Sequence, residues 1–148
     1  MFDIVNFEKF SDGRGDLIPL ELGDNFLKTS IPFEVKRFYF IAFPNDSVDI
    51  KRGNHAHHNL QQLIICASGS FTLDLEDFIG NKESLFLDKN TKGVHIKKGL
   101  IWRQLKNFSP NCVVLVFANQ HFDEKDYIRS YQKFKELSYL QMKAKKLS

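Results

Sequence analysis

The chain of 148 residues lacks the features that mark several protein classes. Its two cysteines, Cys66 and Cys112, each sit in an apolar run without the paired spacing of a zinc site, so we expect buried free thiols. No apolar run approaches the roughly 20 residues that cross a membrane, and no basic region followed by an apolar stretch opens the chain. These absences predict a soluble, cytoplasmic protein with no membrane partner.

A strong charge of one sign is also missing. The net charge is +3, and Lys143, Lys145 and Lys146 near the end of the chain carry much of it. We interpret these lysines as a solvated helical tail, which predicts no nucleic-acid partner. An anionic ligand must therefore be met by a local cluster of cations. The length predicts one domain, residues 1–148, long enough to bury a core.

Phenylalanine, by contrast, is abundant, with 15 residues against one Trp and four Tyr. Aromatic and apolar side chains at alternating positions favour strands, and turns rich in Gly, Pro, Asn or Asp separate the segments. This pattern predicts an all-β sandwich or barrel of the jelly-roll type. Apart from the histidine-rich segment described below, the expected strands are Phe2–Phe10, Asp16–Leu22, Phe33–Phe43, Leu60–Ala67, Ser70–Glu76, Glu83–Leu87, Val94–Lys97, Leu100–Phe108 and Cys112–Phe117.

The hydrophobic period changes near the end of the chain. Apolar residues from Tyr127 to Met142 recur at three- and four-residue steps, as on one face of a helix. Acidic residues precede this stretch and lysines follow it, which suits the helix dipole. We therefore expect a C-terminal helix from about Asp123 to Lys145.

The segment Lys51–Gln62 contains three of the five histidines within four positions. In a strand, alternate side chains point the same way, so His55 and His57 share one face while His58 faces the other. A metal site needs three or four converging donors. The following positions carry Gln61 and Gln62 in place of a carboxylate, and the segment around Trp102 has no histidine. The sequence therefore predicts no metal.

Two interpretations of the histidines stay open on the residues alone. Imidazole titrates near neutrality, so His55 and His57 suit acid–base catalysis, with Arg52 and Tyr39 nearby. The alternative is that they are polar barrel residues that alternate without a chemical role.

Several cations suit a phosphate-containing ligand. Arg14 lies in a glycine-bracketed turn, Arg37 lies on an aromatic segment, and Arg103 follows Trp102. Arginine binds phosphate oxygens bidentately, and a nucleotide would also need an aromatic surface. For any single one of these residues, the alternative is a solvated strand edge.

Several short motifs resemble the sugar 3,4-ketoisomerases of nucleotide-sugar biosynthesis. They span nearly the whole chain in the order of that family. They are Asp12-x-Arg14-Gly15-x-Leu17, Lys36-Arg37-x-Tyr39-Phe40-Ile41, Arg52-Gly53-x-His55-Ala56-His57 with Gln62 and Gly69, Gly99-x-x-Trp102, and Asp123-Glu124-x-Asp126-Tyr127-Ile128-Arg129-x-Tyr131.

The resemblance implies a cupin-type jelly roll and a homodimer with exchanged strands. It also implies action without metal or cofactor on dTDP-4-keto-6-deoxy-D-glucose. In that reaction a base removes the C3 proton, an enediol forms, and a proton reaches C4, leaving the ketone at C3. His55 and His57 then look like the acid–base pair, and Tyr39 and Arg52 like supports for the oxyanion. The implied substrate contacts are Arg14, Asp16, Arg37, Gln62, Trp102 and Arg103.

The chain departs from the family pattern at two places. Asp16 stands where a larger residue is expected, and the loop 43–51 is longer. Family members differ in the C4 configuration of the product, and the sequence leaves this choice open. Three other functions compete: a dTDP-sugar 3,5-epimerase, a non-catalytic nucleotide-sugar-binding module, and a metal-dependent oxygenase, against which the absent carboxylate and histidine argue.

Overall fold

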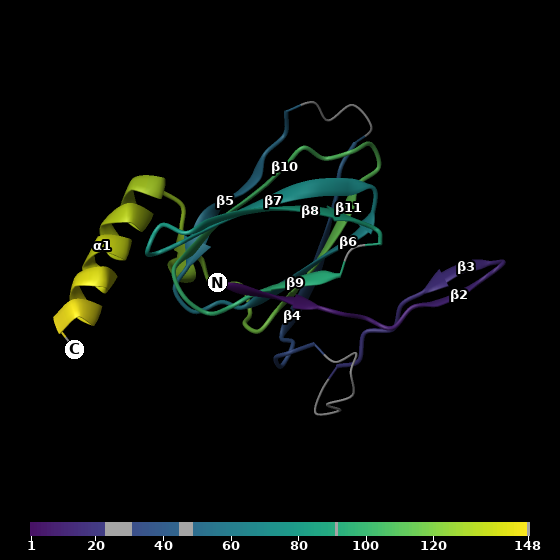
Figure 1. Ribbon diagram of the computed structural model, residues 1–148, viewed down its shortest axis with the longest axis horizontal. Helices are drawn as coiled ribbons and strands as arrows, with labels where there is room; N and C mark the ends of the chain where they lie inside the picture. Colours follow the sequence, from purple (N-terminus) through teal and green to yellow (C-terminus); the bar gives the residue numbers. More distant parts are fainter. Residues whose placement is uncertain (23–30, 45–48, 91, 148) are drawn as a thin grey trace.

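Two five-stranded sheets face each other in the computed structural model, which describes residues 1–22, 31–44, 49–90 and 92–147 (Figure 1). The first sheet has the order β1-β9-β6-β11-β4 and the second β12-β5-β10-β7-β8. The strands of the first are β1 (Phe2–Val5), β9 (Gly93–Ile96), β6 (Gln62–Ser68), β11 (Val113–Ala118) and β4 (Arg37–Ala42). Those of the second are β12 (Tyr127–Ile128), β5 (Arg52–His57), β10 (Ile101–Lys106), β7 (Ser70–Asp77) and β8 (Lys82–Asp88). The predicted all-β jelly-roll architecture is confirmed.

The core lies between the two sheets and follows from the alternation of side chains along each strand. On β7, Phe71, Leu73 and Leu75 are at most 2% exposed, whereas Thr72 and Asp74 face outward and are half-buried. The two cysteines belong to this core, and both are free and buried, as the sequence predicts. Burial raises the pKa of the Cys66 thiol to about 12.

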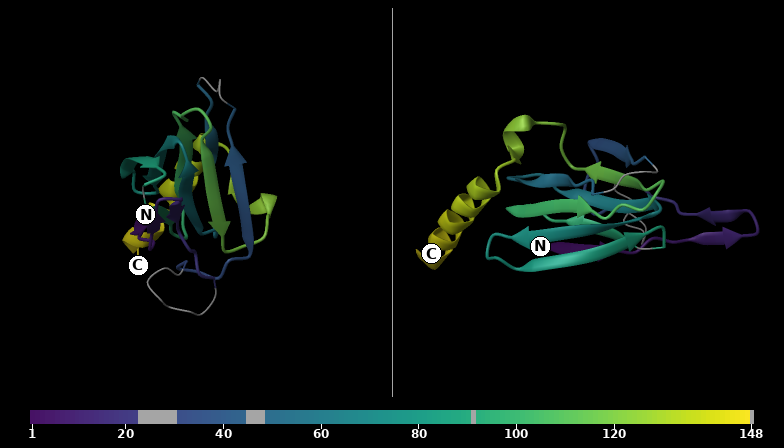
Figure 2. Two further views of the ribbon diagram at one scale, coloured as in Figure 1. Left: turned by 90° about the vertical axis from the view of Figure 1, so that its right-hand side faces the viewer. Right: turned by 90° about the horizontal axis from the view of Figure 1, so that it is seen from above.

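A separate hairpin, β2 (Phe10–Asp12) with β3 (Gly15–Leu17), projects from one end of the sandwich (Figures 1 and 2). The expected strand Phe2–Phe10 is therefore wrong in extent, because β1 pairs with β9 only as far as Val5 and the chain then leaves the sheet. The expected strand Asp16–Leu22 likewise ends at Leu17. Of the predicted connections, residues 23–30 and 45–48 lie outside the described residues.

The C-terminal helix α1 runs from Tyr131 to Leu147, eight residues after the predicted start at Asp123. The intervening chain forms a single 3-10 turn, η1 (Glu124–Asp126), followed by β12. The reason is tertiary: Tyr127 and Ile128 pair with β5, which holds this stretch extended. Among the described residues, no helix is long and apolar enough to cross a membrane.

Candidate active site

A cavity of about 800 Å³ opens between the two sheets. Its walls come from β4, β5, β6, β10, β11 and β12, so residues far apart in the sequence meet here. The polar side chains that line it include Tyr39, Arg52, His55, Gln62, Arg103, Tyr127 and Arg129. The sequence analysis selected five of these residues.

A β-bulge in β5 decides which side chains face the cavity. Gly53 and Asn54 have φ angles of 81° and 53°, and the pairing with β10 shifts register at this point. In a regular strand, Arg52 and His55 would face opposite ways. The extra residue of the bulge turns both toward the same side. Gly53 is required there, because a Cβ would lie 2.8 Å from the carbonyl oxygen of Arg103.

The imidazoles of His55 and His57 lie side by side, with ring centroids 4.7 Å apart and the rings nearly perpendicular. The Nδ1 of His55 lies 3.0 Å from the carbonyl oxygen of Gly53, and the Nδ1 of His57 lies 3.0 Å from Oδ2 of Asp126. Because both partners are acceptors, each Nδ1 carries the proton. The two Nε2 atoms are buried without a partner among the described residues. Both rings therefore offer a lone pair at Nε2.

The buried carboxylate of Asp126 holds His57 in place. Besides the ring nitrogen, it accepts the backbone N–H groups of Asn59 at 2.9 Å and Leu60 at 3.3 Å. The sequence analysis placed Asp126 in the first turn of a helix and gave it no role in the site. The only signal was its place in the motif around Tyr127, since 69 residues separate it from His57.

Both imidazoles stay neutral near neutral pH. Burial and the guanidinium of Arg103 lower the pKa of His55 to about 4. The same two causes, together with the ring of His55, lower the pKa of His57 as well. Neutral imidazole is the form that accepts a proton.

A second network connects Tyr39, Gln62 and Arg103 along the cavity wall. Nη1 of Arg103 donates to Oε1 of Gln62, and Nε2 of Gln62 donates to the Tyr39 hydroxyl at 3.1 Å. Arg103 is 1% exposed, and its Nη2 donates to the carbonyl of Ile101 at 3.1 Å. Burial lowers the pKa of Arg103 to about 10 and raises the pKa of Tyr39. The guanidinium therefore stays charged and the phenol protonated at neutral pH.

Further aromatic and cationic groups surround the imidazoles. The ring of Tyr127 lies 4.2 Å from that of His57, and the guanidinium of Arg129 lies 4.4 Å above Tyr127. Arg37 stacks on Tyr39 at 5.2 Å. Neither Tyr127 nor Arg129 was predicted from the sequence as a site residue, although both belong to the same motif as Asp126. Arg129 is also paired with Glu124, to which its Nε and Nη2 donate at 2.6 and 2.8 Å.

Four of the predicted substrate contacts are not among the residues that line this cavity within one chain. Arg37 lies next to the cavity, stacked on Tyr39. Trp102 occupies the other face of β10 and packs under α1, 5.7 Å from the ring of Phe134. Arg14 and Asp16 lie on the projecting hairpin, where Arg14 pairs with Asp12. Their substrate contacts stay predictions.

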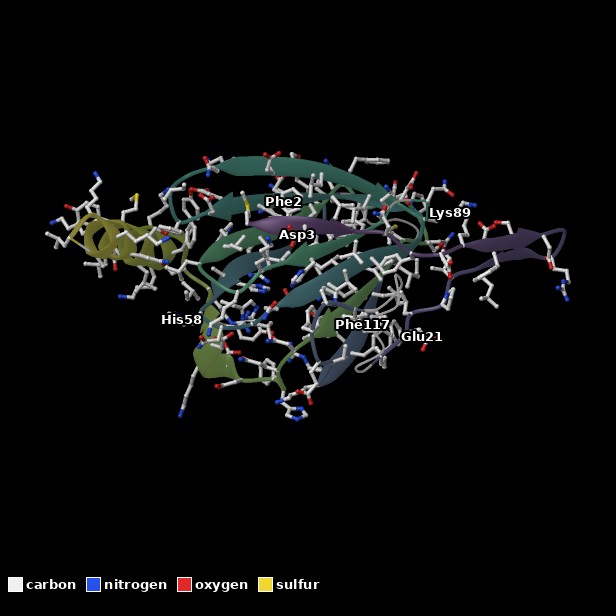
Figure 3. All side chains as sticks on the ribbon, turned by 60° about the horizontal axis from the view of Figure 1, so that its bottom comes forward. Phe2, Asp3, Glu21, His58, Lys89 and Phe117 are labelled. Atoms are coloured by element: carbon white, nitrogen blue, oxygen red, sulfur yellow. The ribbon has the colours of Figure 1, made fainter. Side chains whose placement is uncertain are left out.

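The remaining histidines lie apart from the cavity. His58 is exposed, as expected, and its backbone N–H donates to the carbonyl oxygen of Asp126 in η1 at 3.2 Å (Figure 3). His95 bonds to Oε1 of Gln61 at 3.0 Å. Among the residues that the structure describes, no three His, Cys, Asp or Glu side chains come close enough together to hold a metal ion.

Comparison with known proteins adds independent information. The family model described as "FdtA: WxcM-like, C-terminal" matches residues 1–139. The TDP-4-oxo-6-deoxy-alpha-D-glucose-3,4-oxoisomerase of Aneurinibacillus thermoaerophilus is 37% identical over 134 residues, which cover 90% of this chain and 89% of the relative.

Solved structures agree with these matches. The sugar 3,4-ketoisomerase QdtA of Thermoanaerobacterium thermosaccharolyticum, in complex with TDP, superposes with a TM-score of 0.82 at 32% identity, covering 95% of this chain and 96% of QdtA. The TDP-quinovose 3,4-ketoisomerase WlaRB of Campylobacter jejuni gives a TM-score of 0.77 at 38% identity, covering 91% and 97%. The 4-keto-6-deoxy sugar epimerase NovW of Streptomyces spheroides, at 16% identity and a TM-score of 0.65, shares the fold alone. The chain therefore belongs to the FdtA family of nucleotide-sugar 3,4-ketoisomerases.

Proposed function

We propose that this isomerase converts dTDP-4-keto-6-deoxy-D-glucose into the corresponding 3-keto sugar nucleotide, in deoxyaminosugar biosynthesis. The observation that carries the proposal is the pair of neutral imidazoles, His55 and His57, whose Nε2 atoms are buried without a partner among the described residues. His55 lines the cationic cavity, and the ring of His57 lies directly against that of His55. Family membership supports the substrate. One crystal structure shows QdtA in complex with TDP. Another shows a histidine-to-asparagine mutant of QdtA in complex with TDP-4-keto-6-deoxyglucose.

The reaction moves one carbonyl between neighbouring carbons. The C4 ketone makes the C3 proton acidic, so one neutral imidazole removes it and an enediol forms. O4 gains a proton as the enediol forms. The imidazolium then delivers its proton to C4 while O3 loses its proton, which leaves a hydroxyl at C4 and the carbonyl at C3. No atom is gained or lost, so the two rings exchange protons with the sugar and no redox partner is needed.

The negative charge that develops on the sugar oxygen needs donors close by. Tyr39 and Arg52 line the cavity beside His55, and we assign them this role. The charged guanidinium of Arg103, enclosed in the wall, adds a fixed positive charge. In a site shielded from water, such preorganised charges act more strongly than in bulk solvent.

Asp126 completes the acid–base pair. Its carboxylate holds His57 as the Nδ1–H tautomer and balances the imidazolium that forms when Nε2 takes a proton. The same carboxylate fixes the backbone after β5 through two N–H groups. The orientation of His57 is thereby set before substrate binds.

The nucleotide part would lie toward the open side of the cavity. Arg129 lines the cavity and stacks on Tyr127, and Arg37 lies next to it, stacked on the cavity residue Tyr39. Nε and Nη2 of Arg129 donate to Glu124 at 2.6 and 2.8 Å, so a diphosphate would have to displace this carboxylate to gain the same bidentate donors.

The oligomer we propose is a homodimer with exchanged hairpins. The β2–β3 hairpin pairs with neither of the two main sheets, and it exposes Phe10 and Leu17 by 58% and 62%. The edge strand β4 exposes Phe38 and Phe40 by 51% and 65%. Exposed apolar side chains on a sheet edge favour pairing with another chain. Exchange would also carry Arg14 to a second copy. The cytoplasmic location stays a prediction.

Incubation with dTDP-4-keto-6-deoxyglucose in deuterated water, followed by NMR, tests the proposed function. We expect the carbonyl signal to move from C4 to C3 with deuterium entering at C4, and the same spectrum reports the C4 configuration. Deuterium at C3 and C5 with the carbonyl still at C4 would indicate a 3,5-epimerase. Binding without any exchange would indicate a non-catalytic module.

A further inference from the structure

Gln62 lies at the start of β6, and its side chain is 2% exposed although it reaches the cavity wall. Both ends of its amide have protein partners: Oε1 accepts from Arg103 and Nε2 donates to Tyr39. A side chain whose amide is engaged at both ends is a poor candidate for a direct substrate contact. Such an amide can instead fix how the Tyr39 hydroxyl is oriented, because its own orientation is set by Arg103.

Arg103 fixes which way the amide points. A guanidinium has only N–H donors, so the atom of Gln62 that faces it must be the carbonyl oxygen. The opposite assignment would set N–H groups against one another in a buried place, which is unfavourable. The NH₂ group of Gln62 therefore faces the hydroxyl of Tyr39.

The orientation of the amide in turn decides where the Tyr39 proton goes. An amide nitrogen does not accept hydrogen bonds, so the phenol oxygen is the acceptor in this contact. Gln62 is the hydrogen-bond partner of this hydroxyl among the described residues. The single phenolic proton is then left to point into the cavity. A ketone or enediolate oxygen of the substrate could accept a hydrogen bond from this hydroxyl.

We infer that Gln62 is a positioning residue: the Arg103–Gln62 pair directs the Tyr39 hydroxyl proton toward the reacting sugar oxygen. This inference rests on the proposed function and reassigns Gln62, which the sequence suggested as a substrate contact. Tyr39 then meets the substrate only as a donor. The hydrogen bond from Tyr39 becomes stronger as negative charge develops on the sugar oxygen. Its loss should therefore lower kcat.

The Gln62→Glu variant reverses the direction of the network with almost no change in shape. Glutamate keeps an acceptor for Arg103, but its second oxygen also accepts and draws the Tyr39 proton away from the cavity. We expect kcat to fall about 10²-fold, the size of one lost oxyanion donor. Because Gln62 does not touch substrate, KM should stay within about threefold, the usual scatter for independent changes.

A Gln62→Met variant separates direction from packing. Methionine matches the volume but offers Arg103 no acceptor, so it disturbs the wall more than glutamate does. It leaves the Tyr39 proton free to face the cavity. The inference therefore predicts that Gln62→Met keeps a higher kcat than Gln62→Glu. The reverse order, with Gln62→Met the weaker enzyme, would show that Gln62 serves only to hold the wall together.

A Tyr39→Phe background removes the residue through which Gln62 is argued to act. In that background, Gln62→Glu should lower kcat by no more than about threefold. An undiminished loss there would mean that the added negative charge, and not the Tyr39 proton, is responsible, and the inference would be overturned. Gln61→Glu is the matched control, because Gln61 accepts from His95 outside the cavity and should tolerate the change.

Failure of the inference and failure of the proposed function give different results. If the wild-type chain moves no carbonyl, the proposed function is wrong. If the wild type is active but Tyr39→Phe turns over normally, the role of Tyr39 and the inference fail together, while ketoisomerase activity stands. If Tyr39→Phe is impaired and Gln62→Glu has a normal kcat, only the inference is refuted.

Discussion

Replacing Asp126 with Asn tests the tautomer and charge argument on which the acid–base pair depends. The two carboxylate oxygens divide three N–H groups between them: Oδ1 accepts from Asn59, and Oδ2 accepts from Leu60 and His57. An amide offers oxygen at only one of the two positions. Whichever way it turns, at least one buried N–H faces an NH₂ group, at a cost of about 1–3 kcal/mol in stability.

The loss in catalysis should be larger than the loss in stability. At the observed 3.0 Å between Nδ1 and Oδ2, the carboxylate stabilises the imidazolium that forms on His57. A charge pair at about 4 Å in a partly shielded site is worth about 4 kcal/mol. At about 1.4 kcal/mol per factor of ten, Asp126→Asn should lower kcat about 10³-fold. Substrate binding should change little, because Asp126 lies behind the ring.

The assay is the conversion followed by NMR, run at saturating and at low substrate, with thermal unfolding measured in parallel. Asp123→Asn is the control: Asp123 caps the same turn by accepting the N–H of Lys125 at 3.0 Å, and Asn caps equally well. It removes the same charge three residues away and should leave kcat unchanged. An Asp126→Asn enzyme with kcat within about tenfold of wild type would refute the argument, since a lost general-base contribution exceeds that.

Four further predictions concern the base, the pH dependence of activity and of stability, and the dimer. His57→Asn should abolish turnover yet keep nucleotide-sugar binding, measured by calorimetry, within a few-fold; near-normal turnover would remove His57 from the mechanism. Because burial lowers the pKa of His55 to about 4 and also that of His57, kcat/KM should stay level as pH falls through 6.5, with its acidic limb near pH 4. An acidic limb centred at pH 6.5 would contradict this. The unfolded histidines take up protons from about pH 6.5 and the folded ones do not, so chemical denaturation should show full stability above that pH and a loss as pH falls toward 4. Leu17→Asp, on the exposed hairpin, should give a monomer by light scattering, whereas Ile79→Asp, 56% exposed in the turn after β7, should leave the dimer intact; a dimer in both variants would refute hairpin exchange.

Local pattern was enough to predict most strands. Alternation of Phe71, Leu73 and Leu75 with polar neighbours specifies one buried face, and the structure shows that face in the core. The same period predicted His55 and His57 on one face, and their rings do lie side by side. Such features depend on neighbours one or two positions away, which a sequence displays directly.

The rest depends on contacts between distant segments. The helical period from Tyr127 predicted a helix there, but this segment pairs with β5 instead. That pairing brings Asp126 within hydrogen-bond distance of His57. The bulge at Gly53 depends on its register against β10, and the direction of Gln62 depends on Arg103, 41 residues away. Residue type and spacing thus determined the strands, the shared face of the histidines and the family resemblance. Only the packing of the two sheets decided which groups orient the histidines, because a hydrogen bond between distant segments forms only when both segments are fixed in register.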